Sequence, residues 1–111
     1  MDKVEKVVIL GAGPAGLSAA LYAARAELNP LVLTGLQPGG QASLTNTIEN
    51  YPGFPQGVGG AELGELFQKQ AEHFGARIEF DSVTGVDFSA KPLIVKTYDK
   101  EIKTESVIIA T

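Results

Sequence analysis

Cysteine and tryptophan are absent from the 111 residues, and histidine occurs only once, as His73. Without cysteine the chain forms no disulfide and performs no thiol–disulfide exchange, and its composition says little about the redox compartment. His73 is expected on the polar face of a helix, where a solvated imidazole is far commoner than a metal ligand. We therefore expect neither a metal site nor a catalytic side chain in these residues.

A surplus of positive charge is also absent. Nine Lys and Arg residues stand against 13 Asp and Glu residues, which gives a net charge of −4. This balance argues against nucleic acid or an anionic membrane as a partner, since both bind basic surfaces. It does not exclude a dinucleotide, because backbone N–H groups hold a pyrophosphate without basic side chains.

Long apolar runs are missing as well. No stretch approaches the roughly 18 apolar residues that cross a bilayer, and residues 1–6 lack the apolar core of a signal peptide. We therefore expect a cytoplasmic protein. The length suits one domain or a large part of one, and 44% hydrophobic with 20% charged residues is typical of a globular chain.

The first part of the sequence predicts a β-α-β unit. Residues 6–10 end in a continuous apolar run, which is typical of a strand buried on both faces of a parallel sheet. A helix is expected over 14–26, where Pro14 is tolerated in the first turn. Residues 31–34 form the next apolar strand. Two strands with a helix between them imply parallel pairing and a right-handed crossover.

Residues 35–60 have a different character. They hold seven of the 13 glycines and three of the six prolines. A loop of this length is uncommon in a compact domain unless it serves a ligand or a partner. Residues 44–48 suit either a short strand or a helical turn, and the sequence does not decide between them.

The second half predicts one helix followed by strands. A helix over 61–74 carries an apolar stripe and ends before Gly75, which suits a left-handed C-terminal position. The stripe consists of Leu63, Leu66, Phe67, Gln70, Ala71 and Phe74. Strands are expected over 77–80, 82–88, 93–98, 101–104 and 107–111. The last is of the buried type, and ligands of α/β sheets lie beyond the carboxyl ends of such strands. We therefore expect the chain to stop where a binding site would be completed.

Residues 11–16, Gly-Ala-Gly-Pro-Ala-Gly, match the pattern G-x-G-x-x-G. Gly11 permits the tight turn, Gly13 lets a pyrophosphate approach the backbone, and Gly16 lets the helix pack against the strand. The motif follows an apolar strand and opens a helix, which is the context that makes it informative. It predicts a dinucleotide site, with a turn that serves packing alone as the alternative.

The sequence departs from the usual pattern at the ribose. The expected Asp or Glu at the end of the second strand is replaced by Thr34 and Gly35, and the next acid downstream is Glu49. Thr34 or backbone groups are then left to hold the adenosine ribose. This departure counts against a nicotinamide nucleotide more than it identifies another dinucleotide.

Two further segments are candidates for ligand contact. Residues 38–41, Pro-Gly-Gly-Gln, let a backbone pass close to a ring or phosphate, and Gln41 both donates and accepts; a plain surface turn is the alternative. Asn50 lies before a stiff aromatic turn, where it bonds either a ligand or the backbone. Tyr51 and Phe54 are expected to anchor the loop rather than to stack on a ligand.

These motifs, taken in order, resemble the low-molecular-weight, bacterial-type thioredoxin reductases. The resemblance covers the whole chain and extends to thioredoxin-reductase-like ferredoxin–NADP reductases and peroxiredoxin reductases. It rests on residues 8–16, 20–26, 34–35, 39–41, 48–54 and 107–111. It implies an α/β fold: a Rossmann-like FAD-binding domain with a central parallel sheet and a small antiparallel β-meander, of which residues 1–111 form the incomplete N-terminal part.

The resemblance also implies a reaction and an FAD site. In such enzymes electrons pass from NADPH through FAD to a protein disulfide, with thioredoxin or a similar protein as partner, and the subunits form homodimers. The residues implied at the pyrophosphate turn are Gly11, Gly13, Pro14, Ala15 and Gly16. Those implied near the adenosine are Thr34, Gly35 and Val83. Those implied near the ribityl chain and flavin are Gly40, Gln41 and Asn50, and Thr111 lies where the family's Ala-Thr-Gly motif passes the cofactor.

Several family features do not occur in the sequence. There is no Cys-x-x-Cys, no second G-x-G-x-x-G and no Gly-Asp motif. We therefore expect these residues to be the FAD-binding segment of such an oxidoreductase and not to be catalytically competent alone. The alternatives are a stand-alone module that binds FAD or an adenine nucleotide without turnover, and a chain that folds but binds nothing.

Overall fold

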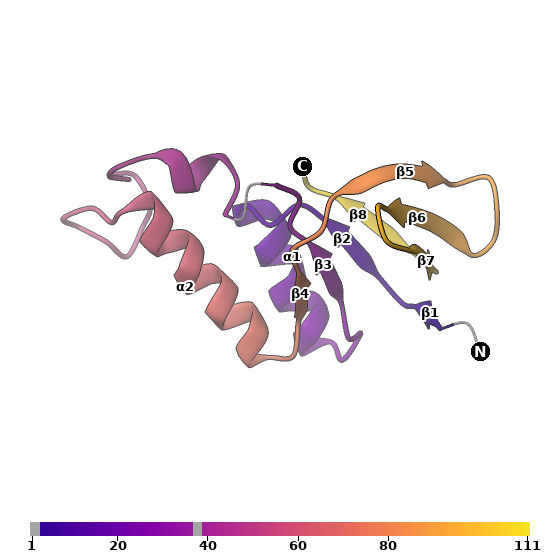
Figure 1. The fold of residues 1–111 in the computed structure, drawn as a ribbon. Helices are drawn as coiled ribbons and strands as arrows, with labels where there is room; N and C mark the ends of the chain where they lie inside the picture. The colour runs from indigo at the N-terminus through magenta and orange to yellow at the C-terminus, as the bar shows by residue number, and fades with distance from the viewer. Residues whose placement is uncertain (1–2, 37–38) are drawn as a thin grey trace.

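The computed structural model describes residues 3–36 and 39–111, without the side chain of Gln41. Two helices, one 3-10 turn and two four-stranded sheets make up an elongated molecule of 50 × 27 × 19 Å. In Figure 1 the helices lie to the left of the antiparallel strands, and the C-terminus lies at the top, between the two groups. The predicted α/β architecture is confirmed.

The central sheet is parallel throughout. Its order is β4 (Arg77–Glu79), β3 (Leu31–Leu33), β2 (Val8–Leu10) and β8 (Val107–Ile109). Strands β2 and β3 are joined by helix α1 (Pro14–Arg25), which confirms the predicted β-α-β unit. All four strands therefore point their carboxyl ends to one edge, which also carries the glycine turn.

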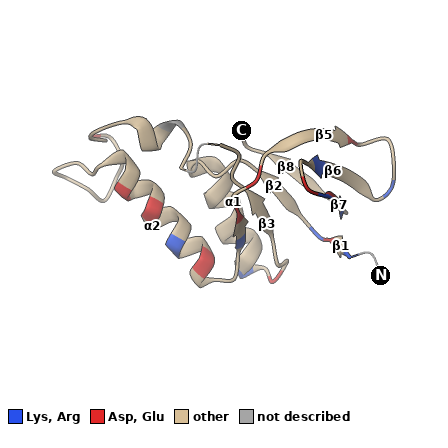
Figure 2. Ribbon diagram, viewed as in Figure 1, with Lys and Arg blue, Asp and Glu red and all other residues tan. Residues whose placement is uncertain are grey.

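The helices cover one face of this sheet. Ile9 and Val32 point toward α1 and α2 (Gly60–His73), where they join Leu17, Ala20 and Ala71 in one buried cluster. Gly75 follows α2 with φ +107°, the left-handed conformation that its predicted position requires. Charged residues follow the exposed face of α2 (Figure 2).

The meander covers the other face. Strands β5 (Val83–Asp87), β6 (Leu93–Thr97) and β7 (Glu101–Thr104) pair antiparallel in chain order. Val95 and Ile102 pack on Val8, Leu10 and Leu33 to form the second buried cluster. Because alternate residues of β2 and β3 face opposite clusters, both faces are apolar, as the continuous runs in the sequence predicted.

Strand β1 (Val4–Glu5) was not predicted, since two residues carry no periodicity. It pairs parallel with β7, and Glu5 is 8% exposed. Its carboxylate accepts hydrogen bonds from Arg77 on β4, at the far side of the other sheet. This hydrogen bond lowers the pKa of Glu5, with a smaller opposing effect from burial.

The segment between β3 and α2 is a loop with one short helical turn. The 3-10 turn η1 (Gln41–Leu44) occupies its first part, and Ile48 forms an isolated antiparallel bridge with Val58. The undecided residues 44–48 are thus the end of a helical turn and the start of a bridge. The bridge closes residues 48–58 into a loop over α2.

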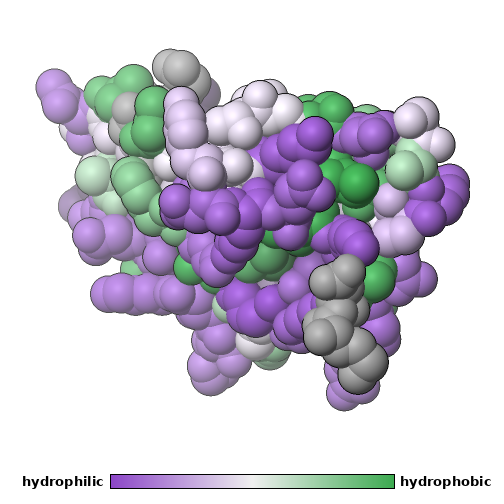
Figure 3. Space-filling view, turned by 45° about the vertical axis from the view of Figure 1, so that its right-hand side comes forward, coloured by the Kyte–Doolittle hydropathy of each residue, from purple (hydrophilic) through white to green (hydrophobic). Residues whose placement is uncertain are grey.

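Two details of the predicted burial are wrong. Ile109 of β8 is 66% exposed, because the strand pairs only with β2 and leaves its other edge open. On α2, Leu66 and Phe74 are about half exposed and Gln70 is exposed, so the buried stripe is narrower than predicted. Apolar surface is visible among hydrophilic side chains in Figure 3. Neither helix in the described residues has the length and apolar character needed to cross a membrane.

Candidate dinucleotide-binding site

Gly11 opens the turn at the carboxyl end of β2. It has φ +113°, and a Cβ there would lie 2.3 Å from the Ala110 carbonyl oxygen. Its N–H donates to the Leu33 carbonyl at 3.0 Å, so the turn is fixed to β3 as well. Only glycine satisfies both the conformation and the contact with the chain after β8.

Gly16 lets α1 begin directly against this turn. A Cβ on Gly16 would lie 1.9 Å from the Gly11 carbonyl oxygen, which confirms its predicted packing role. Gly13 differs from the prediction in one respect. A Cβ on Gly13 would point at Gly40, 3.4 Å from its Cα, rather than into open space. The glycine at position 13 therefore also serves contact between two backbone segments.

The N-terminus of α1 is suited to an anion. Gly13 is its N-cap residue, and no side chain caps it. The first turn contains no acidic residue, and Pro14 and Ala15 are exposed. N–H groups in a first helical turn have no intrahelical acceptor, and the helix dipole adds positive potential there. This end of α1 can therefore hold a phosphate without any basic side chain.

Thr34 and Gly35 lie at the neighbouring strand end. Thr34 is buried, and its hydroxyl donates to the Gly35 carbonyl at 2.8 Å. The N–H groups of both residues donate to the carbonyls of Glu79 and Asp81, at 3.0 and 2.8 Å. Gly35 has φ +72° with nothing within 4 Å of a Cβ position, so the space beside it is open.

The segment after residue 38 packs on the glycine turn. The N–H of Gly39 donates to the Ala12 carbonyl at 3.0 Å, and a Cβ on Gly40 would lie 2.8 Å from the Gly13 Cα. Gly39 is buried, so a plain surface turn does not describe it. Pro38 and the side chain of Gln41 lie outside the described residues, and the predicted ligand contact of Gln41 stays a prediction.

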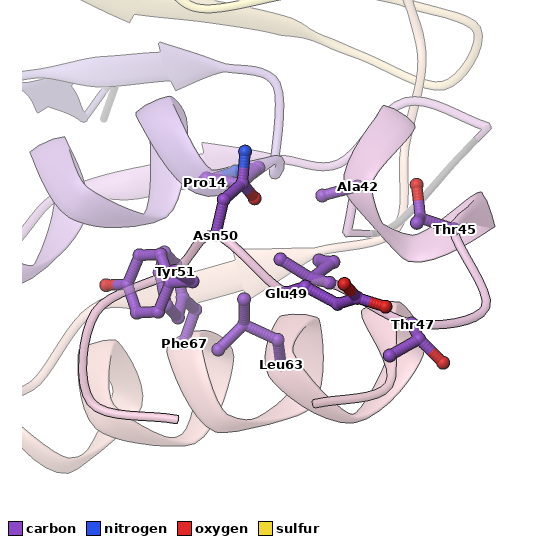
Figure 4. A pocket seen from close by; sticks show the side chains of 10 residues that line it. Pro14, Ala42, Thr45, Thr47, Glu49, Asn50, Tyr51, Leu63 and Phe67 are labelled. Carbon is purple, nitrogen blue, oxygen red and sulfur yellow. The ribbon is translucent and has the colours of Figure 1, made fainter. Parts of the chain in front are cut away.

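A cavity of ≈ 450 Å³ adjoins this turn (Figure 4). It lies between the start of α1, the η1 segment, the closed loop and α2. Its lining residues are Pro14, Ala42, Thr45, Thr47, Ile48, Glu49, Asn50, Tyr51, Leu63 and Phe67. Most of them were not predicted as site residues. They come from four segments, and only the folding of the loop over α2 brings them together.

Three consecutive residues, 49–51, contribute a carboxylate, an amide and an aromatic ring to the cavity lining. The Asn50 side chain lies beside Pro14 in Figure 4 and makes no hydrogen bond in the described part of the chain. The alternative, in which the Asn50 side chain forms a hydrogen bond with the backbone, is therefore not seen in the described residues. Tyr51 packs on Phe67 and Phe54 with ring centroids 5.6 and 6.1 Å apart, which confirms its anchoring role. Glu49 contributes the carboxylate of the lining.

The two remaining predicted residues occupy different surroundings. Val83 begins β5 and is half-buried against the second apolar cluster. Thr111 is exposed, and its backbone nitrogen lies 3.1 Å from the Cβ position of Gly11. The structure thus brings Gly11, Gly13, Gly40 and Thr111 together, and Asn50 lines the cavity that adjoins them.

Comparison with known proteins gives a consistent result. The family described as pyridine nucleotide-disulphide oxidoreductase matches residues 5–111. The chain is 52% identical to a thioredoxin reductase of Rickettsia bellii, over 100% of this chain and 36% of that protein. It is 49% identical to thioredoxin reductase 1, mitochondrial, of Arabidopsis thaliana, over 96% of this chain and 30% of that protein.

A solved structure agrees with these sequences. The thioredoxin reductase of Lactococcus lactis is 41% identical and superposes with a TM-score of 0.90, covering 96% of this chain and 35% of that one. The chain therefore spans about a third of the length of the relatives that it matches.

Proposed function

This chain belongs to the pyridine nucleotide-disulphide oxidoreductase family, and on that premise we propose that it binds FAD as part of a thioredoxin-reductase-like oxidoreductase. The observation that carries the proposal is the glycine turn at the carboxyl edge of the parallel sheet, followed by an uncapped helix without first-turn acids. Such a turn fits a pyrophosphate.

Each part of the cofactor has a matching surface. The pyrophosphate fits the first-turn N–H groups of α1 beside Gly13 and Ala15. The adenosine fits the open space at Gly35, with Val83 nearby in the chain that follows β4. The flavin fits the cavity beside Asn50, whose ≈ 450 Å³ is within the usual range for small-molecule sites. Thr111 and Gln41 are the remaining residues that we assign to the FAD site.

The bound flavin would supply two-electron transfer between a nicotinamide nucleotide and a disulfide. The chain's own residues would bind and orient the cofactor. Backbone N–H groups neutralise phosphate charge, Asn50 offers a donor and an acceptor, and the Tyr51 and Phe67 rings form an aromatic wall. NADPH as donor, thioredoxin as acceptor and a homodimeric assembly belong to this proposal for the whole enzyme.

The absence of cysteine favours a second function for the chain by itself. These residues cannot exchange disulfides, so binding of FAD or an adenine nucleotide without turnover is the alternative. The two functions share one site and differ in whether a cysteine pair and a nicotinamide site operate beside it. Neither function predicts that these residues alone reduce a disulfide dye with NADPH, so such turnover would contradict both.

ADP titration of the ¹⁵N-labelled chain tests the site. We expect the amide signals of Gly13, Ala15, Gly16 and Gly35 to shift in a saturable way. Amides of the connection between β5 and β6, which lies at the end of the molecule away from the helices in Figure 1, serve as the internal control. Shifts that avoid residues 11–16 would place the nucleotide elsewhere and refute the assignment.

A further inference from the structure

We propose that Gly60, at the start of α2, is a positioning residue for the glycine turn of α1. This inference rests on the proposed function, because the turn matters only if it holds the dinucleotide. Gly60 is not among the residues that line the cavity. Its effect passes through the backbone segment 39–45, which lies between the two helix starts.

The first contact joins this segment to the turn. Gly39 donates its N–H to the Ala12 carbonyl at 3.0 Å, and a Cβ on Gly13 would touch the Gly40 Cα at 3.4 Å. A Cβ on Gly40 would lie 2.8 Å from the Gly13 Cα, closer than real Cβ contacts. The two backbones therefore touch without any side chain between them, and a shift of one displaces the other.

The second contact joins the same segment to α2. The N–H of Gly60 donates to the Thr45 carbonyl at 3.0 Å. A Cβ on Gly60 would lie 2.1 Å from the Ala42 carbonyl oxygen and 2.3 Å from that of Thr45. Gly60 is buried and has no left-handed φ, so its need for glycine comes from this close approach.

The segment between the contacts is braced internally. The Ser43 hydroxyl donates to the Gly40 carbonyl at 2.7 Å, and the Thr45 N–H donates to the Ala42 carbonyl at 3.2 Å. The Cβ of Ser43 lies where a Gly39 side chain would be. A displacement at Ala42 and Thr45 therefore reaches Gly40 instead of being absorbed by a loose loop.

The neighbouring glycine provides a matched control. Gly59 precedes Gly60, and a Cβ there would meet its nearest atom, the Asn46 carbonyl oxygen, at 3.7 Å, an ordinary contact. We compare Gly60→Ala with Gly59→Ala in the 111-residue chain. In Gly60→Ala the dissociation constant for FAD should rise about tenfold, because small misplacements of binding groups are costly. In Gly59→Ala it should stay within about twofold.

Amide chemical shifts of the ligand-free chain supply a readout that a merely structural role would not move. Gly60→Ala should shift the amides of residues 11–16, whereas Gly59→Ala should not. Affinity is measured at a temperature where circular dichroism shows each variant fully folded. If Gly60→Ala does not fold, Gly64→Val replaces it, since a Cβ at Gly64 already lies 3.4 Å from the Gly39 Cα.

The outcomes separate this inference from the proposed function. Shifted turn amides with weakened FAD binding support both. Shifted turn amides in a chain whose wild type binds no FAD support the positioning and refute the proposed binding. A folded Gly60→Ala chain with unmoved turn amides and unchanged FAD affinity overturns the inference and leaves the binding proposal intact.

Discussion

Glu5 on β1 and Arg77 on β4 form a two-pronged ion pair that joins the two sheets. Nη2 of Arg77 lies 2.5 Å from Oε1 of Glu5, and Nη1 lies 3.3 Å from Oε2. The Glu5 side chain is 9% exposed and that of Arg77 is 34% exposed. Arg77 also donates to the Asn29 carbonyl at 2.6 Å, so it ties three segments together.

The pair predicts a pH-dependent stability. The Glu5 carboxylate accepts hydrogen bonds from Arg77, and this lowers the pKa of Glu5 below the ordinary value of 4.5. The pair's contribution is therefore complete above pH 4.5 and is lost as the pH falls through the lowered pKa. Glu5→Gln should reduce the free energy of unfolding by about 1.5 kcal/mol at pH 7, at the low end for charged hydrogen bonds because Arg77 is partly exposed.

Urea unfolding at a series of pH values checks this prediction. The difference between wild type and Glu5→Gln should shrink as the pH falls below 4.5. Glu79→Gln is the control, since Glu79 pairs with Lys100 at the surface. This substitution should reduce the free energy of unfolding by less than about 1 kcal/mol. A difference that stays constant down to pH 2 would refute the linkage.

Gly16→Ala should destabilise the chain, against the usual preference of a helix for alanine. The new Cβ would collide with the Gly11 carbonyl, and overpacking of this kind costs about 1–3 kcal/mol or more. Gly64→Ala in α2 is the matched control, because its Cβ meets Gly39 at 3.4 Å and the helix gains up to about 1 kcal/mol. Thermal unfolding measures both, and equal effects would mean that Gly16 is not needed for packing.

Ala15→Glu should move stability and nucleotide affinity in opposite directions. Ala15 is exposed in the first turn of α1. A carboxylate at this position interacts favourably with the helix dipole and stabilises the helix by about 0.3–1 kcal/mol. The same charge repels a pyrophosphate, so ADP affinity should fall at least about tenfold. Ser18→Glu, exposed in the next turn, is the control. If Ala15→Glu binds ADP as tightly as the wild type, the phosphate does not bind at this end of α1.

Asn50→Ala should weaken FAD binding and spare ADP binding. Asn50 lines the cavity assigned to the flavin, and one lost hydrogen bond of about 1 kcal/mol corresponds to roughly a fivefold change in affinity. Asn46 is an exposed asparagine of the same loop outside the lining, so Asn46→Ala should change neither affinity. Equal losses of FAD and ADP binding in Asn50→Ala would place Asn50 near the adenosine instead.

The sequence predicted best where the structure is locally determined. The strand, turn and helix of residues 8–25 follow from an apolar run, three glycines and Pro14, all within one supersecondary unit. Strand β1 was missed because only its pairing with β7 and the distant Arg77 make it a strand. The exposure of β8 depends on which strands lie beside it, which a single apolar run does not encode.

The candidate site, too, has parts that could be predicted from local sequence and parts that depend on contacts between distant residues. The glycine turn was identifiable from its spacing, but the packing of Gly13 on Gly40 was not, because the two residues are 27 positions apart in the sequence. Leu63 and Phe67 were assigned to the apolar face of α2 and also line the cavity. Their second role arises only when the loop closed by Ile48 and Val58 folds over the helix.

The central claim is that the chain binds FAD through its adenosine pyrophosphate, and titration followed by flavin fluorescence tests it most directly. FMN is the matched ligand, since it carries the same flavin and one phosphate but lacks the adenosine monophosphate half of FAD. The account predicts saturable FAD binding that ADP displaces, and much weaker FMN binding. A folded chain that binds FMN as tightly as FAD, or binds neither, would contradict it.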